Sequence, residues 1–157
     1  MPVHLVIETR ALALSSRVVR ARATRMLRAI QMEKAELSIV LTGDKQIHKL
    51  NKLYRGKDRA TDVLAFAMQE GEFGAISAGL LGDVIVSLPT AGRQARERNV
   101  TPLDEVTMLI AHGILHLLGW DHDTDAKDRS MKKETDRLCA AAASGPLYKG
   151  GKRKRQT

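Results

Sequence analysis

The sequence predicts one domain built from both α-helices and β-strands. Its 157 residues, 43% of them hydrophobic, suit a single core that buries roughly two-thirds of the surface of the unfolded chain. Segments with strand-like alternation are interleaved with longer segments of helical periodicity. No apolar run is long enough to cross a bilayer, and the N-terminus lacks the pattern of a signal peptide. The single cysteine, Cys139, has no disulfide partner within the chain, so we expect a reducing, cytoplasmic location.

The first half of the chain alternates predicted strands with predicted helices. Residues 3–7 are rich in β-branched side chains and predict a strand, which a helix from about residue 12 to 32 follows. A second strand is predicted at 37–41, and Gly43 and Asp44 then lead into a short helix. A charged loop that contains a glycine enters an apolar strand at about residue 63.

The second half is predicted to be mainly helical. Residues 69–79, with three glycines and no periodic pattern, predict a loop before a strand at 80–87 that ends at Pro89. Helices are predicted at 91–99, from about Pro102, and after a cap at Thr124 or Asp125. We expect the folded domain to cover residues 1–148, and the polar, basic residues 149–157 to form a disordered tail.

Three of the five histidines, His112, His116 and His122, fall within eleven residues. His112 and His116 are four apart, so on a helix their imidazoles project from the same face, one turn apart. Gly119 can take the left-handed conformation that ends a helix, which would bring His122 round as a third ligand. Three neutral imidazoles suit Zn²⁺ and leave a fourth tetrahedral position open for water or substrate. We therefore predict one catalytic zinc ion per chain.

The helix that carries the first two histidines has a clear predicted start and a clear apolar face. Thr101, Pro102 and Asp104 form a cap, a first-turn proline and a capping-box carboxylate. At 100° per residue, the histidines fall about a quarter turn from the aliphatic face, at the edge of the core. That aliphatic face is made of Leu103, Val106, Ile110, Ile114 and Leu117.

Two acids beside the histidines have open roles. Asp121 could close the metal site as a further ligand or support a histidine from outside the ligand set. Glu105 lies two turns before His112 on the same helix face, and it could support a histidine or be a solvated helix carboxylate. The sequence does not choose between these alternatives.

The net charge predicts a polyanionic partner. The 26 lysines and arginines outnumber the 18 acids, which gives a formal charge of +8. Arginines gather on one face of the first predicted helix, and Arg55, Lys57 and Arg59 crowd the loop before the strand at residue 63. A solvated, functionally silent surface is the alternative for each group. With aromatic residues only 3% of the chain, phosphate contacts rather than base stacking should supply most of the affinity for a nucleic acid.

Three blocks of the sequence stand out by their order and spacing. The first is the histidine segment, with its aromatic residue before the final Asp-His. A second block runs from Asn51 through Arg55 to Phe66, and a third from Leu81 to Ser87. The three blocks resemble the shared motifs of one known family, the bacterial rRNA maturation factors or YbeY-type endoribonucleases. The resemblance departs at Ala60, Ala65 and Ala67, where the family usually has proline, serine and proline; this concerns the rigidity of the strand ends and one hydrogen bond.

This resemblance implies a fold, a cofactor and an activity. The fold is a single α+β domain, with a small mixed sheet of about four strands packed with about five helices and a zincin-like metal helix. The cofactor is Zn²⁺ held by His112, His116 and His122, which with Arg55 form the catalytic set. The activity is cleavage of single-stranded RNA in the maturation of the 16S rRNA 3′ end and in ribosome quality control, with rRNA and the ribosome or its small subunit as partners.

Arg55 is expected to stabilise the negative charge that builds on the phosphoryl oxygens, since a forked guanidinium suits a phosphate better than an ammonium does. A structural salt bridge from Arg55 to Asp58 or Asp62 is the alternative.

Two other functions compete with RNA cleavage. The spacing of the histidines is also that of metzincin proteases, but those enzymes carry a glutamate directly after the first histidine, where this chain has Gly113. A ribosome-binding protein braced by zinc, without catalysis, would normally have a fourth protein ligand, because structural zinc sites are closed.

Overall fold

Alternate residues of β2 (Glu36–Thr42) are apolar and point into the main core. Leu37, Ile39 and Leu41 of this strand are fully buried, whereas Ser38 and Val40 between them are only partly covered. The two-residue period of a strand therefore places one face of the sheet against the core. In this computed structural model, the described residues are 3–68 and 79–143.

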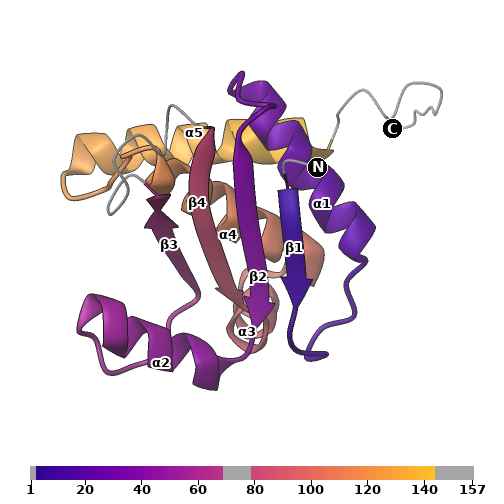
Figure 1. Ribbon diagram of the computed structural model, residues 1–157, viewed down its shortest axis with the longest axis vertical. Helices are drawn as coiled ribbons and strands as arrows, with labels where there is room; N and C mark the ends of the chain where they lie inside the picture. Colours follow the sequence, from indigo (N-terminus) through magenta and orange to yellow (C-terminus); the bar gives the residue numbers. More distant parts are fainter. Residues whose placement is uncertain (1–2, 69–78, 144–157) are drawn as a thin grey trace.

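The sheet has four strands in the order β1-β2-β4-β3. The strands β1 (Val3–Ile7), β2 and β4 (Leu80–Ser87) run parallel, whereas β3 (Val63–Ala67) pairs antiparallel with β4 at the edge. The predicted α+β fold with a mixed sheet is confirmed, and Figure 1 shows the four strands side by side.

Helices cover both faces of the sheet. The main core joins β2 and β4 to α1 (Ser16–Ala29), α4 (Pro102–Leu117) and α5 (Asp125–Ala143), and α4 and α5 lie behind the strands in Figure 1. On the opposite face, Ile47 of α2 (Asp44–Arg55) packs with Leu64 and Ile85 in a smaller cluster. The helix α3 (Leu88–Arg98) connects β4 to the segment before α4. In this arrangement the histidine helix α4 lies between the sheet and α5.

The helix predicted at residues 12–32 is shorter in the structure, and capping explains the difference. The side chain of Ser15 accepts a hydrogen bond from the backbone of Val18 at 3.3 Å. This N-cap fixes the start of α1 at Ser16. Gln31 adopts a φ of 59°, a left-handed conformation that a helix cannot continue. The amphipathic pattern extends beyond both signals, but the backbone follows the caps.

The helix predicted at 91–99 begins earlier, at Leu88. The side chain of Ser87 caps it, and Pro89 lies in its first turn rather than ending the strand from outside. At α5, the cap is Thr124, whose hydroxyl accepts from the backbone of Lys127 at 3.1 Å. The predicted loop at 69–79 falls outside the described residues except for its last residue, and the basic tail at 149–157 lies wholly outside them. Among the described helices, none is long and apolar enough to span a membrane.

Candidate metal centre and basic hollow

The structure brings His112, His116 and His122 together at one point on the surface of the domain. The Nε2 atoms of His112 and His116 lie 3.1 Å apart, and the ring centroids of these two residues are 5.8 Å and 5.6 Å from that of His122. One ligand atom from each of the three residues lies within 4.8 Å of the others. This group could hold a metal ion, because nitrogens bound about 2 Å from one tetrahedral ion are separated by little more than 3 Å.

The turn after α4 delivers the third histidine. Gly119, with a φ of 96°, donates from its backbone to His116 O at 3.0 Å, and Trp120 donates to Leu115 O at 3.0 Å. These two bonds form a Schellman motif, which ends the helix and reverses the chain. The backbone confirms the prediction that Gly119 ends the helix. His122 follows on an exposed loop.

The surroundings hold two of the three imidazoles in the neutral form that a metal needs. Burial lowers the pKa of His112 below its usual value, and the neighbouring His116 lowers it further, while Asp62 acts in the opposite direction. Burial also lowers the pKa of His116, with His122 adding to the effect. The donor set therefore fits a divalent ion of the zinc type, which prefers neutral imidazole nitrogens.

The backbone of Trp120 orients His116. This backbone raises the pKa of His116, which is the effect expected of a carbonyl that accepts from the ring N–H. Since the Nε2 atom of His116 faces His112, the ring presents that nitrogen to the centre. Such carbonyl contacts commonly fix the orientation of histidine ligands. Sequence reasoning did not identify this role, because a backbone contact carries no residue-type signal.

Close packing explains why position 113 is a glycine, which the sequence did not reveal. A Cβ atom added at this position would lie 2.7 Å from Cγ1 of Val84, a fully buried residue of the central strand β4. The helix therefore packs directly on the sheet through this glycine. A glutamate here would be directed into the sheet, so the position could not supply a general base to the histidine centre.

Arg55 lies at the last position of α2 and contacts the edge strand β3. Its Nη2 donates to Ala65 O at 2.7 Å, and its guanidinium carbon lies 4.6 Å from the centroid of the Phe66 ring. The two acids considered as salt-bridge partners have other contacts: Asp58 lies 2.7 Å from His48, and Asp62 accepts from the backbone of Val63 at 2.8 Å. The bond to Arg55 uses the backbone of Ala65, so it does not require the serine that the family usually has there.

Arg55 and His116 line the same hollow. This basic hollow has a volume of about 360 Å³ and lies between the end of α2, the following loop, β3 and α4. Its walls are Asn51, Arg55, Lys57, Arg59, Thr61, Val63, Leu64, Ala65 and His116. The buried amide of Asn51 donates to Arg59 O at 2.9 Å and so fixes the loop that carries two of the cations. Three cationic side chains therefore surround a hollow that ends at the histidine centre.

The two acids with open roles stand apart from the ligand group. Asp121 accepts from the backbone of Asp123 at 3.4 Å, and its carboxylate lies 3.9 Å from Lys127 Nζ. Glu105 is 1% exposed, with its carboxylate 3.1 Å from Arg98 Nε. Burial raises the pKa of Glu105, although the charge of Arg98 lowers it in part. Among the described residues, the group that could hold a metal contains the three histidines and neither acid.

Fold and site together define a class: a single α+β domain in which one long helix and the turn after it bring three histidines together, one of which, His116, also lines a hollow with three cations. The particular family is shown by comparison of the sequence. A family model described as Endoribonuclease YbeY matches residues 6–143, and the chain belongs to this family.

Several bacterial proteins named Endoribonuclease YbeY are similar to the chain. The protein of Geobacter metallireducens is 44% identical over 74% of this chain and 77% of its own length. That of Geobacter sulfurreducens is 39% identical over 85% and 91%, and that of Aquifex aeolicus 44% identical over 77% and 79%. The solution structure of TM1509 from Thermotoga maritima has the same fold, with a TM-score of 0.62 and 25% identity over 96% of this chain and 99% of that one.

Proposed function

We propose that the protein is a zinc-dependent endoribonuclease that cleaves single-stranded RNA. The activity comes from the family, whose members are named for it. One observation carries the proposal for this chain: Arg55 and His116 line one hollow, so a phosphate bound at the cations would lie beside the histidine centre. The zinc identity is supported by three convergent imidazoles, two of which have lowered pKa values.

His112, His116 and His122 would hold the ion, which when bound supplies Lewis-acid chemistry and lowers the pKa of water. The chain's own contribution is to position the RNA. Arg55 is fixed by the carbonyl of Ala65 and the ring of Phe66, which limits the entropy that it loses when a phosphate binds. A guanidinium has five N–H donors, so one of them can hold Ala65 while others contact phosphoryl oxygens.

The loop cations extend this contact along the RNA. Lys57 and Arg59 are exposed in the same hollow, where each can neutralise a phosphate neighbouring the one to be cleaved. A single strand fits better than a duplex, because its backbone can bend to bring one phosphate into a hollow of this size. The finer proposal, action on the 3′ end of 16S rRNA and in ribosome quality control in the cytoplasm, is supported by the motif resemblance and by the net charge of +8.

The two competing functions are less well supported. A protease of the metzincin type needs its general base next to the first histidine, and Gly113 at that position packs against Val84. A purely structural zinc site would be closed by a fourth ligand, but the described group has three members, of which His122 is exposed.

The test is cleavage by the zinc-loaded protein of three substrates under the same conditions: a single-stranded RNA, the same RNA in a duplex, and casein. We expect fragments from the single strand, few from the duplex and none from casein. Cleavage of casein with the RNA left intact would reject the proposal in favour of a protease. Binding of RNA without cleavage, at full zinc occupancy, would favour a structural zinc.

A further inference from the structure

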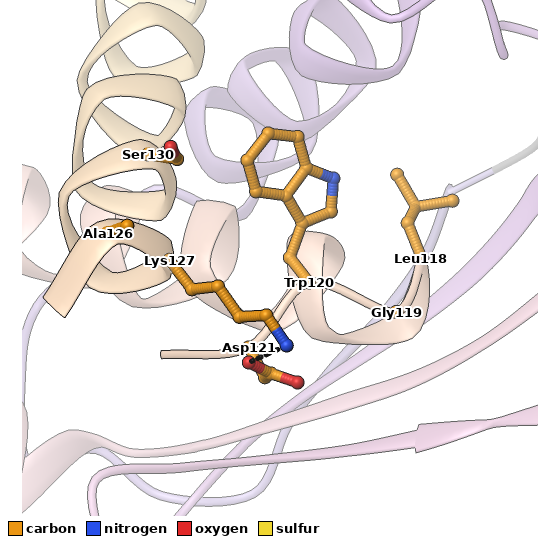
Figure 2. A pocket seen from close by; sticks show the side chains of 7 residues that line it. All are labelled: Leu118, Gly119, Trp120, Asp121, Ala126, Lys127 and Ser130. Carbon is orange, nitrogen blue, oxygen red and sulfur yellow. Dashed lines mark ion pairs between the residues drawn. The ribbon is translucent and has the colours of Figure 1, made fainter. Parts of the chain in front are cut away.

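A second hollow lies beside the segment that links His116 to His122, and the single tryptophan of the chain is one of its walls. It has a volume of about 430 Å³ and lies between the turn after α4 and the first turns of α5. Its walls are Leu118, Gly119, Trp120, Asp121, Ala126, Lys127 and Ser130 (Figure 2). Trp120 is 37% exposed, and Leu118 beside it is 36% exposed. Large apolar side chains at a surface hollow are typical of a binding site.

The charges around this hollow disfavour a phosphate. Lys127 is its cation, and its Nζ lies 3.9 Å from Asp121 and 3.5 Å from Asp123, so two carboxylates already offset one ammonium. Figure 2 shows Lys127 extended across the hollow towards Asp121. An uncharged, flat group is therefore favoured over an anion. The amino edge of a nucleobase can also donate to Asp121, which an aliphatic side chain cannot do.

The hollow and the histidine centre are built on the same backbone turn at the end of α4. Trp120 donates from its backbone to Leu115 O, and the preceding residue Gly119 donates to His116 O. The indole and His116 thus share one rigid turn. A group stacked on Trp120 would be held at a fixed distance from the centre, in addition to the contacts that phosphates make in the basic hollow on the β3 side.

We infer that the hollow at Trp120 binds one unpaired nucleobase of the RNA substrate, stacked on the indole, close to the phosphate that is cleaved. The inference rests on the proposed RNA-cleaving function and adds a subsite to it. Base stacking on an aromatic side chain tolerates all four bases, so this subsite selects for an unpaired nucleotide rather than for a sequence. It would therefore provide a direct reason for single-strand preference, since a base within a duplex cannot reach the indole.

The first measurement uses the fluorescence of Trp120, which is the only tryptophan. The zinc-loaded protein is titrated with a short single-stranded RNA and with an abasic phosphodiester chain of the same length. We expect the RNA to quench the fluorescence and the abasic chain to leave it unchanged, although the abasic chain competes for binding. Equal quenching by both, or none by either, would overturn the inference.

The second measurement is kinetic, and zinc content and melting temperature are recorded for each variant. Trp120→Ala keeps the backbone bonds of the turn and alters no member of the histidine group, so it should retain zinc. We expect its KM for single-stranded RNA to rise about tenfold, the effect of losing one stacked base, with kcat near that of the parent. Trp120→Phe should restore most of the KM.

Val100→Ala, which shortens a similarly exposed apolar side chain between α3 and α4, is the matched control and should behave as the parent. An unchanged KM in Trp120→Ala, with RNA still cleaved, would overturn the subsite and leave the proposed function standing. Failure of the parent itself to cleave RNA would instead reject the proposed function, and the subsite with it.

Discussion

His112 and His116 approach each other to 3.1 Å through their Nε2 atoms. Without an ion, one of these nitrogens can donate to the other, and His122 offers a third ligand atom within 4.8 Å of both. Burial lowers the pKa of both residues, so mutual repulsion of charged rings does not separate them at neutral pH. The arrangement is that of ligands organised before the ion binds, which reduces the entropy cost of binding.

Loss of any one histidine of the centre should empty it. We expect about one zinc ion per chain in the parent and little or none in His112→Ala, His116→Ala and His122→Ala, measured by elemental analysis after dialysis. His48→Ala is the matched control, because this histidine lies on α2, contacts Asp58 and is outside the group. Full zinc occupancy in all three variants would rule out the assignment.

Acid should release the metal below the usual histidine range. Coordination needs the neutral rings, and the pKa values of His112 and His116 are lowered from 6.5, so protons should displace zinc only at pH values below 6.5. Zinc retention measured across a pH series should therefore be complete at neutral pH and fall below 6.5. Release that begins above neutral pH would contradict the role of burial.

Gly113→Ala should destabilise the protein, because the new methyl group would lie 2.7 Å from Val84. Overpacking of this kind costs roughly 1–3 kcal/mol. In chemical denaturation, we expect Val84→Ala to reduce this cost when it is combined with Gly113→Ala, so that the double variant is more stable than the sum of the single effects predicts. Simple additivity would show that the contact with Val84 is not what requires glycine.

Glu105→Gln should stabilise the protein at neutral and basic pH. Burial raises the pKa of Glu105 in the folded state above the ordinary 4.5, so its contribution to stability is complete below pH 4.5 and is lost as the pH rises through the folded value. We expect the variant to match the parent near pH 4.5 and to have a higher melting temperature than the parent near pH 8. A lower melting temperature near pH 8 would mean that the contact with Arg98 outweighs burial.

RNA binding should depend on salt through the cations of the basic hollow. Each phosphate contact contributes about 0.7 to the slope of log affinity against log salt for a single strand, so Lys57→Ala with Arg59→Ala should reduce the slope by about 1.4. Lys34→Ala, an exposed lysine between α1 and β2, should leave the slope unchanged. Removal of residues 149–157 should weaken binding without abolishing cleavage. An affinity that does not vary with salt would refute the phosphate contacts.

The histidine centre could be predicted from the sequence because its parts are local. Helical spacing aligns His112 with His116, and a glycine at position 119 ends the helix, so one short segment contains the whole group. The ends of α1 could not be predicted as well, since the apolar periodicity continues past the cap at Ser15 and the left-handed residue Gln31. Where two local signals compete, the pattern alone does not show which one the backbone follows.

The position of Arg55 beside His116 depends on tertiary structure. It requires β3 to pair antiparallel with β4 at the edge of the sheet, which brings the end of α2 to the histidine helix. Strand pairing is a long-range property that periodicity does not encode. Arg55 was therefore indicated by the family resemblance and not by spacing. The role of Trp120 was missed for another reason, because its carbonyl is a group that every residue has.

The most direct test of the account measures zinc content, melting temperature and cleavage of single-stranded RNA together on the parent, His116→Ala, Arg55→Ala and Arg55→Lys. We expect His116→Ala to lose zinc and cleavage. We expect Arg55→Ala to keep zinc and thermal stability but to cleave about a hundredfold more slowly, the usual cost of one transition-state donor, with only partial recovery in Arg55→Lys. Cleavage by Arg55→Ala at the rate of the parent would contradict the account.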